Sequence, residues 1–248
     1  MTMKNIDVSL EALLEAGAHF GHQIKRWNPK MKPYIYGSRG GVHIFDLLKT
    51  KECILNASQY LQELQREGKV VLFVGTKKNA KAKIIEVARL LGQPYVDERW
   101  LGGTLTNFDQ IRKSVRKLAE LKEDMASGKY KYYTKKERLD IERKIEKLEL
   151  AVGGISTMEK LPDAVVIVDI HREHSALREA KERKVTVVGI VDTNSDPGEV
   201  AYPVPMNDDA TSAIEYVLQV FLDAMLNTKP AKVVKTGKVK AKKKAVKK

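Results

Sequence analysis

The stretch VVLFVGTKKNAKAKIIEVARLLG, residues 70–92, decides the fold class of this chain. Its first five residues, Val70 to Val74, are all apolar, which is typical of a β-strand that is buried on both faces. Gly75 then turns the chain, and residues 78–91 follow a helical pattern that ends at Gly92. A strand that leads directly into a helix is the repeating unit of parallel α/β sheets.

The same unit recurs in the C-terminal half of the chain. A strand pattern over residues 164–168 precedes a helix, and VTVVGIVD (185–192) is another apolar run. The stretch at 203–226 then predicts a short strand and a final helix. With one more short strand near Tyr95 and Val96, the sequence predicts a doubly wound parallel sheet of about five strands.

One insertion interrupts this alternation of strands and helices. Between RWLGGTLTNF (99–108) and PDAVVIVD (162–169) there is no strand pattern. Two apolar seams with heptad spacing lie there instead. The first, interrupted by Lys122, is formed by Ile111, Val115, Leu118 and Met125, and the second by Ile141, Ile145, Leu148 and Val152. Thr134 and Glu137 have the spacing of a capping box at the start of the second helix. We predict an antiparallel helical hairpin that projects from the sheet domain, the alternative being a hairpin packed flat on the core.

The N-terminal part predicts smaller elements. Residues 9–20 read as a short helix with Ser9 as its N-cap, and YIYGSRGGVHI (34–44) reads as a β-hairpin. Residues 46–66 form a long helical pattern that Gly68 ends. We therefore expect a discontinuous α/β domain over residues 1–104 and 156–228, with a basic loop and β-hairpin at 25–45. The helical hairpin occupies 105–155, and a lysine-rich tail at 229–248 is expected to be disordered.

The positive charge of the chain is concentrated in two places. The net charge is +13, but residues 229–248 hold ten lysines and no acidic residue, which leaves the first 228 residues at only +3. Residues 21–51 hold seven basic residues and one acidic residue. Clusters of this kind on a nearly neutral body predict a polyanionic partner.

Residues 25–39, which we call the basic patch, contain no acidic residue. Five side chains there can neutralise phosphates: Lys25, Arg26, Lys30, Lys32 and Arg39. Pro29 and Pro33 stiffen the backbone, so that less entropy is lost on binding. Three rings, Trp27, Tyr34 and Tyr36, can stack on bases, the alternative being core packing, for which Trp27 is the best candidate. We predict that the patch binds nucleic acid.

The motifs of common enzymes are missing from the sequence. It contains no phosphate-binding G-x-x-x-x-G-K-[ST] or G-x-G-x-x-G, no G-x-S-x-G and no H-E-x-x-H. An enzymatic alternative would be a nucleotide- or metal-dependent hydrolase that uses Asp169, His171 and Asp192 at the carboxyl edge of the sheet. His43 reads as structural, and the alternative for His171 and His174 is a solvated helix N-terminus.

We expect no metal and no cofactor, although His19, His22 and Asp192 are the candidates for a metal site. The only cysteine, Cys53, cannot form a disulfide within the chain and fits a reducing compartment. The acidic residues in the N-terminal apolar stretch argue against a signal peptide. No apolar run in the sequence approaches the length of a membrane-spanning helix.

Several stretches, in chain order, closely resemble the bacterial small-subunit ribosomal protein S-two family. The likeness runs from about residue 8 to residue 226 and leaves out the tail. It is carried by EAGAHFGHQIKRWNPKMKPYIYG, GGVHIFDLLKT, VLFVGTKK, RWLGGTLTNF, LPDAVVIVDIHREHSALREA, VVGIVDTNSDP and YPVPMNDDATSAI.

The resemblance implies a flavodoxin-like three-layer α/β/α sandwich with a five-stranded parallel sheet of order 2-1-3-4-5 and a protruding coiled-coil hairpin. It also implies a cytoplasmic structural protein of the small ribosomal subunit, placed between head and body and supporting translation. The implied partners are 16S rRNA and neighbouring ribosomal proteins, including the mRNA-binding protein S-one. Catalysis, a small-molecule substrate and a membrane are not implied.

On this basis we expect three contacts with RNA. The first is the basic patch with Asn28, Tyr36, Arg99 and Trp100. The second is the hairpin, through Asn107, Arg112, Lys113, Arg116, Lys117, Arg143, Lys144 and Lys147. The third is the tail, including Lys242, Lys243, Lys244, Lys247 and Lys248. The remaining alternative is a free-standing interaction module that docks protein through the hairpin and touches membranes or nucleic acid through the tail.

Overall fold

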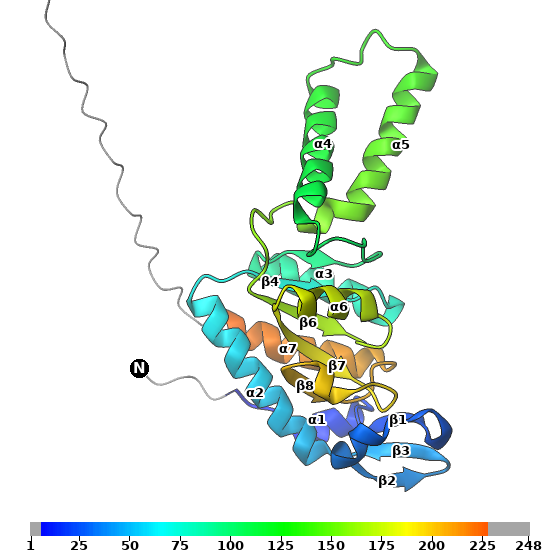
Figure 1. The fold of residues 1–248 in the computed structure, drawn as a ribbon, viewed down its shortest axis with the longest axis vertical. Coiled ribbons are helices and arrows are strands. Elements are labelled where there is room, and N and C mark those ends of the chain that lie inside the picture. The colour runs from blue at the N-terminus through cyan, green and yellow to red at the C-terminus, as the bar shows by residue number, and fades with distance from the viewer. Residues whose placement is uncertain (1–5, 228–248) are drawn as a thin grey trace, which may run out of the picture.

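A five-stranded sheet with helices on both faces forms the body of the molecule, and two helices project from one end of it (Figure 1). The computed structural model describes residues 6–227. The lysine-rich tail, and with it the expectation of disorder, lies outside the described residues.

The strands of the main sheet are all parallel. They are β4 (Val71–Val74), β5 (Tyr95–Val96), β6 (Ala164–Val168), β7 (Thr186–Val191) and β8 (Tyr202–Pro205). Their spatial order is β5-β4-β6-β7-β8, which is the 2-1-3-4-5 order expected from the resemblance. The predicted α/β class and five-stranded parallel sheet are therefore confirmed. The edge strand β8 contains two prolines, Pro203 and Pro205.

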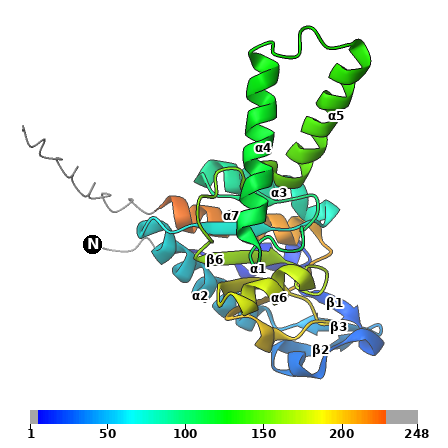
Figure 2. The same ribbon diagram turned by 45° about the horizontal axis from the view of Figure 1, so that its top comes forward.

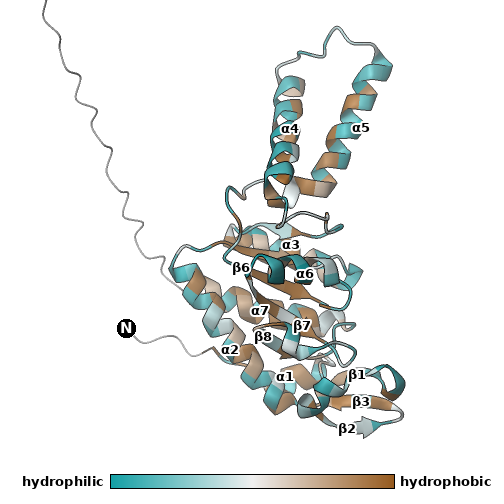
Figure 3. Cartoon of the chain, in the orientation of Figure 1, coloured by the Kyte–Doolittle hydropathy of each residue, from teal (hydrophilic) through white to brown (hydrophobic). Residues whose placement is uncertain are grey.

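Alternate strand residues enter two separate cores. Phe73, Val166 and Ile190 face α2 (Leu47–Arg66), α3 (Lys78–Leu91) and α7 (Thr211–Leu226). On the other face, Leu72 and Val165 pack with α6 (His174–Glu182) and the base of the projecting helices. Because both faces are covered, the central strands β4 and β6 contain only apolar residues, and Figure 3 shows β6 in brown.

Helix boundaries follow the capping residues. Asp46 accepts a 3.1 Å hydrogen bond from the backbone N–H of Leu48 at the start of α2. Gly68 and Gly92 follow α2 and α3 in the left-handed conformation, with φ of 68° and 65°. The boundaries predicted for these two helices are confirmed.

A small antiparallel sheet precedes the main sheet. It contains β1 (Phe20–Gln23), β2 (Ile35–Arg39) and β3 (Val42–Phe45) in the order β1-β3-β2. The predicted β-hairpin is present, and Gly40 and Gly41 form its turn with φ of 60° and 81°. The helix predicted for residues 9–20 is too long, because α1 covers only Leu10–Glu15. Gly17, with φ of 75°, reverses the chain, and the next residues join the sheet as β1.

The projecting helices are α4 (Phe108–Ala126) and α5 (Lys135–Val152), and Figures 1 and 2 show them standing out from the sheet. The predicted capping box is present: the hydroxyl of Thr134 accepts from the N–H of Glu137, whose carboxylate accepts from the N–H of Thr134. Ile111, Leu118 and Leu121 of α4 are buried, whereas Val152 is the buried residue of α5. That the pair forms a coiled coil stays a prediction.

Both ends of this hairpin are fixed to the body. On the entry side, the buried carboxylate of Glu179 accepts five hydrogen bonds of 2.8–3.0 Å from the loop before α4. The donors are the Trp100 indole, the backbone N–H groups of Gly103, Leu105 and Thr106, and the Thr106 hydroxyl. On the exit side, α5 leads into the 3₁₀ helix η3 (Gly153–Ile155), and the Cα of Gly154 lies against the carbonyl and ring of Tyr95. These contacts set the direction in which the hairpin leaves the sheet.

Candidate nucleic-acid interface

The basic patch is fastened to the carboxyl edge of the main sheet. It contains two 3₁₀ helices, η1 (Ile24–Arg26) and η2 (Pro29–Tyr34). Met31 of η2 is fully buried beside Phe45, and the N–H of Asn28 donates to the carbonyl of Thr193 at 2.7 Å. The side chain of Asn28 caps η2 by accepting from the N–H of Lys30 at 3.0 Å. The patch is therefore an ordered surface, and Asn28 helps to shape it.

Four cations of the patch point into solvent. Lys25, Arg26, Lys32 and Arg39 are exposed, and none of them forms an ion pair within residues 6–227. Unpaired cations on an ordered backbone can bind phosphates without first losing an internal partner.

Lys30 differs from the other four cations. Its Nζ lies 2.5 Å from Oδ2 of Asp196, in the loop after β7. This contact raises the pKa of Lys30 and lowers the pKa of Asp196. The charge of Lys30 is already balanced, so that it contributes less to the field of the patch than the sequence predicts.

The three rings of the patch have different surroundings. Tyr36 is 82% exposed on β2, so that its face is open to a base. Trp27 is half-buried and packs against the imidazole of His43, with 4.9 Å between ring centroids. The interpretation of Trp27 as an anchor and of His43 as structural agrees with this contact. Tyr34 is also half-buried.

The predicted contacts outside the patch lie around the hairpin. Arg99 and Asn107 are exposed near its base. Trp100 requires a correction: the residue is 7% exposed and its indole donates to Glu179, so that it belongs to the core. Of the hairpin residues predicted to contact RNA, Arg112 is partly buried. The other basic ones are exposed: Lys113, Arg116, Lys117, Arg143, Lys144 and Lys147.

Next to the patch, polar side chains gather at the carboxyl edge of the sheet. His22 of β1 and the buried Asp192 lie 2.9 Å apart, and this contact raises the pKa of His22. Lys77 lies 3.0 Å from Asp169 and 2.6 Å from both Asp208 and Asp209. These ion pairs join the loops after β4, β6 and β8.

Burial and the nearby carboxylates of Asp192 and Asp169 raise the pKa of Asp208 to about 7, although Lys77 opposes the shift. For Lys77, burial alone would lower the pKa, but the bonds to Asp208 and Asp209 raise it. Lys77 therefore stays charged and acts as the centre of the cluster, where it offsets part of the repulsion among the carboxylates.

The residues of the enzymatic alternative do not assemble into a catalytic set. Asp192 pairs with His22, and Asp169 pairs with Lys77. His171 is exposed, and it has no hydrogen bond or ion pair with either carboxylate in the described part of the chain. His19 does not join His22 and Asp192, and residues 6–227 contain no group of three or more side chains placed to hold a metal ion.

Sequence reasoning did not identify Lys77, Asp208 and Asp209 as members of this cluster. A signal was available, because "GTKK" follows β4 and "NDDA" follows β8. Loops at the carboxyl ends of parallel strands meet at one edge of a sheet, which would have brought these residues together.

Within residues 6–227, none of the helices combines the length and apolar composition required to cross a lipid bilayer.

Comparison with known proteins agrees with the resemblance. Residues 13–228 match the family described as Ribosomal protein S2. The chain is 49% identical over 219 residues to the small ribosomal subunit protein uS2 of Roseiflexus sp. (strain RS-1), an alignment that covers 88% of this chain and 84% of the relative.

Two further relatives carry the same name. The protein of a Nitratiruptor species is 47% identical over 222 residues, covering 90% of this chain and 83% of the relative. The protein of Geotalea uraniireducens (strain Rf4) is 45% identical over 229 residues, covering 92% and 90%.

These matches exclude the enzymatic alternative, because the family consists of structural ribosomal components rather than enzymes. The matched region includes the main sheet, the basic patch and the helical hairpin. The family match and the identities to these relatives show that the chain belongs to the ribosomal protein S2 family.

Proposed function

We propose that this chain is a structural constituent of the small ribosomal subunit in the cytoplasm, where it binds 16S rRNA between head and body. The observation that carries the proposal is the set of four exposed cations on the basic patch that lack an internal ion pair. The names of the relatives support the ribosomal setting. The basic patch needs no catalytic group, because its contacts with phosphates position the protein on the RNA.

Three parts of the chain share the RNA contact. Arg99 and the basic patch bind phosphates beside the sheet, and Tyr36 stacks on a base or sugar. The helical hairpin reaches a second RNA element with the basic residues of α4 and α5. The lysine-rich tail adds affinity that does not depend on sequence.

As domain organisation we propose a flavodoxin-like sandwich over residues 1–104 and 156–228, with residues 105–155 as an inserted coiled coil. The five parallel strands and the two buried faces support the sandwich.

Changing all four unpaired cations of the patch to alanine should weaken binding to a 16S rRNA fragment and lower its salt dependence. Each lost phosphate contact removes about 0.7 to 0.9 from the slope of log K against log salt concentration. The variant Lys25→Ala, Arg26→Ala, Lys32→Ala, Arg39→Ala should therefore lose roughly 3 from the slope, if each cation contacts one phosphate. Filter binding or fluorescence anisotropy over a salt series measures this slope.

The matched control removes the same charge from exposed positions outside the patch and hairpin. It combines alanine at Arg66, Lys78, Lys160 and Arg178. If the two quadruple variants have equal slopes, the patch has no special role in RNA binding. Circular dichroism would establish that both variants remain folded.

We further propose that a neighbouring protein, S-one, docks on an apolar groove beside the patch. The groove has a volume of about 390 Å³ and lies between α1, the β-hairpin and the start of α2. Leu14 and Leu48 line it and are 54% and 63% exposed. Exposed apolar side chains that gather in this way are typical of protein contacts.

The double variant Leu14→Ser, Leu48→Ser should therefore reduce the amount of S-one that co-sediments with purified small subunits, because the contact loses apolar area. Occupancy of the variant itself in the same gradient fractions is the control. Normal S-one occupancy in these subunits would contradict the docking site.

A further inference from the structure

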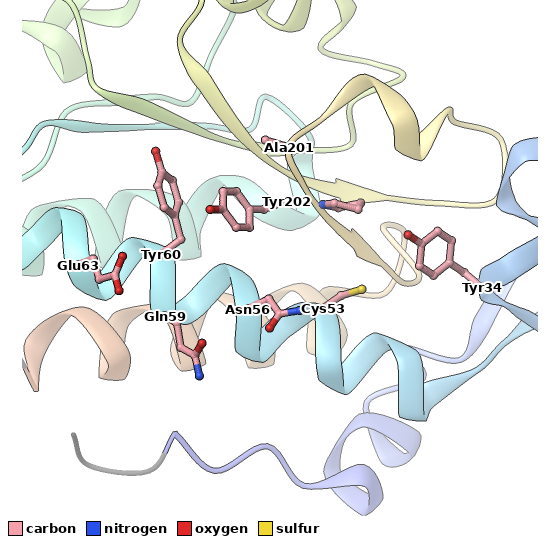
Figure 4. Close-up of a pocket in the computed structure, with 9 residues that line it drawn as sticks. Tyr34, Cys53, Asn56, Gln59, Tyr60, Glu63, Ala201 and Tyr202 are labelled. Atoms are coloured by element: carbon pink, nitrogen blue, oxygen red, sulfur yellow. The ribbon is translucent and has the colours of Figure 1, made fainter. Parts of the chain in front are cut away.

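A second groove lies between α2 and β8, the strand at the edge of the sheet opposite β5. Its volume is about 450 Å³. Figure 4 shows Asn56, Tyr60 and Glu63 of α2 on one side and Tyr202 of β8 on the other, with Tyr34 at the far end. The rings of Tyr60 and Tyr202 are stacked, with 4.4 Å between centroids and an interplanar angle of 15°.

The lining of this groove has the chemistry of a site for an extended peptide. Tyrosine rings offer flat faces for proline and for the charged ends of lysine side chains. The amides of Asn56 and Gln59 can donate to and accept from a peptide backbone, which has no hydrogen bonds of its own when extended. Glu63 is exposed and has no ion pair within residues 6–227, so that its carboxylate is free to bind a cation.

The described part of the chain ends beside α2, the helix that lines one side of this groove. Asn227, Asp223 and Gln62 line one small cavity of about 260 Å³. Gln62 belongs to α2, next to Glu63 and three residues after Gln59. The side chains of Gln59 and Glu63 line the groove.

The residues that follow Asn227 have a matching composition. The sequence continues TKPAKVV, residues 228–234, with two lysines, one proline and no acidic residue. Seven extended residues span about 23 Å, whereas α2 rises by about 15 Å from Cys53 to Glu63. The segment is therefore long enough to cross α2 and enter the groove.

We propose that residues 228–234 of this chain occupy the groove between α2 and β8 when the protein is free. Pro230 then lies against the tyrosine rings, and Lys229 or Lys232 pairs with Glu63. A polyanion that binds the tail competes with these contacts and releases the segment. The start of the tail is thus held on the protein until a partner withdraws it.

Cys53 reports on this contact, because it is the only cysteine of the chain and lines the groove. The test measures the rate at which an aromatic disulfide reagent modifies Cys53 in the free, full-length protein. The variant Lys229→Glu, Lys232→Glu should react several-fold faster than wild type, because the tail loses its attraction to Glu63. The matched control Lys247→Glu, Lys248→Glu makes the same change of charge at the end of the tail and should react like wild type.

Variants on the groove side complete the test. Glu63→Gln should accelerate the reaction of Cys53, whereas Glu146→Gln, an exposed carboxylate on the helical hairpin, should not. Equal rates in all variants would overturn the proposal. Protection that increases with protein concentration would also overturn it, since it would assign the contact to a second copy. No RNA is present, so that the result is independent of the proposed rRNA binding.

Discussion

Replacement of Glu179 by alanine should lower the free energy of unfolding by about 3 to 5 kcal/mol. Glu179 is 8% exposed, and its carboxylate accepts from the Trp100 indole, three backbone N–H groups and one hydroxyl. Alanine provides no acceptor, and each buried donor left without a partner costs about 1 to 3 kcal/mol, less what water recovers. The loop before α4 should therefore lose its structure first.

Urea unfolding followed by circular dichroism measures this loss. The control Glu182→Ala removes an exposed carboxylate from the same helix, α6, and should change stability by less than about 0.5 kcal/mol. For a chain of this size, the loss at Glu179 corresponds to a fall in Tm of roughly 6 to 20 °C. Similar stabilities of the two variants would show that the loop is held by other contacts.

The effect of Glu179 should also depend on pH. Burial alone would raise the pKa of this carboxyl, but the hydrogen bonds from Trp100, Thr106, Gly103 and Leu105 outweigh burial and lower it. A carboxyl whose pKa is lower in the folded state stabilises the protein above its ordinary pKa of about 4.3. That stability is lost as pH falls through the lowered value, so that the difference between wild type and Glu179→Ala should shrink in acid.

Gly154→Ala should destabilise the protein by about 2 to 3 kcal/mol, although it adds only one methyl group. A Cβ at this position would overlap the carbonyl oxygen of Tyr95 and meet the Tyr95 ring at 2.8 Å. Tyr95 belongs to β5 and is paired with Phe73 of β4, so that its backbone cannot move without disturbing the sheet. We expect η3 to shift instead and the base of α5 to detach.

The matched control is Gly102→Ala, at the other end of the helical hairpin. A Cβ there meets nothing within 4 Å, and the backbone of Gly102 is not left-handed. Thermal unfolding should separate the two variants, and limited proteolysis should cleave the Gly154→Ala protein faster near the base of the hairpin. Equal unfolding temperatures would mean that η3 tolerates the displacement at little cost.

The main sheet could be predicted from sequence because its signals are local. Val71 to Val74 and Ala164 to Val168 are short, uninterrupted apolar runs, rich in β-branched residues, which are typical of strands buried on both faces. Gly68, Gly92 and the Thr134 capping box mark helix ends within a few residues of the helices themselves. Periodicity and capping therefore located most elements without knowledge of tertiary contacts.

The details of the candidate interface could not be predicted in the same way, because they depend on distant partners. The charge of Lys30 is balanced by Asp196, 166 residues away. Trp100 next to Arg99 reads as part of a surface, but Glu179 of α6 draws its indole into the core. The strand β1 forms by pairing with β3. Its four residues, FGHQ, have no strand pattern of their own.

The prolines of β8 affect how readily the newly made chain aggregates before it binds its partners. An open sheet has two edges, and an unpaired edge can recruit a strand from another molecule and start aggregation. Two of the four residues of β8 have no N–H to offer to an incoming strand, and the opposite edge strand, β5, is only two residues long. Both sides of the sheet are thus poor templates, which favours a newly made chain that stays separate and available for assembly.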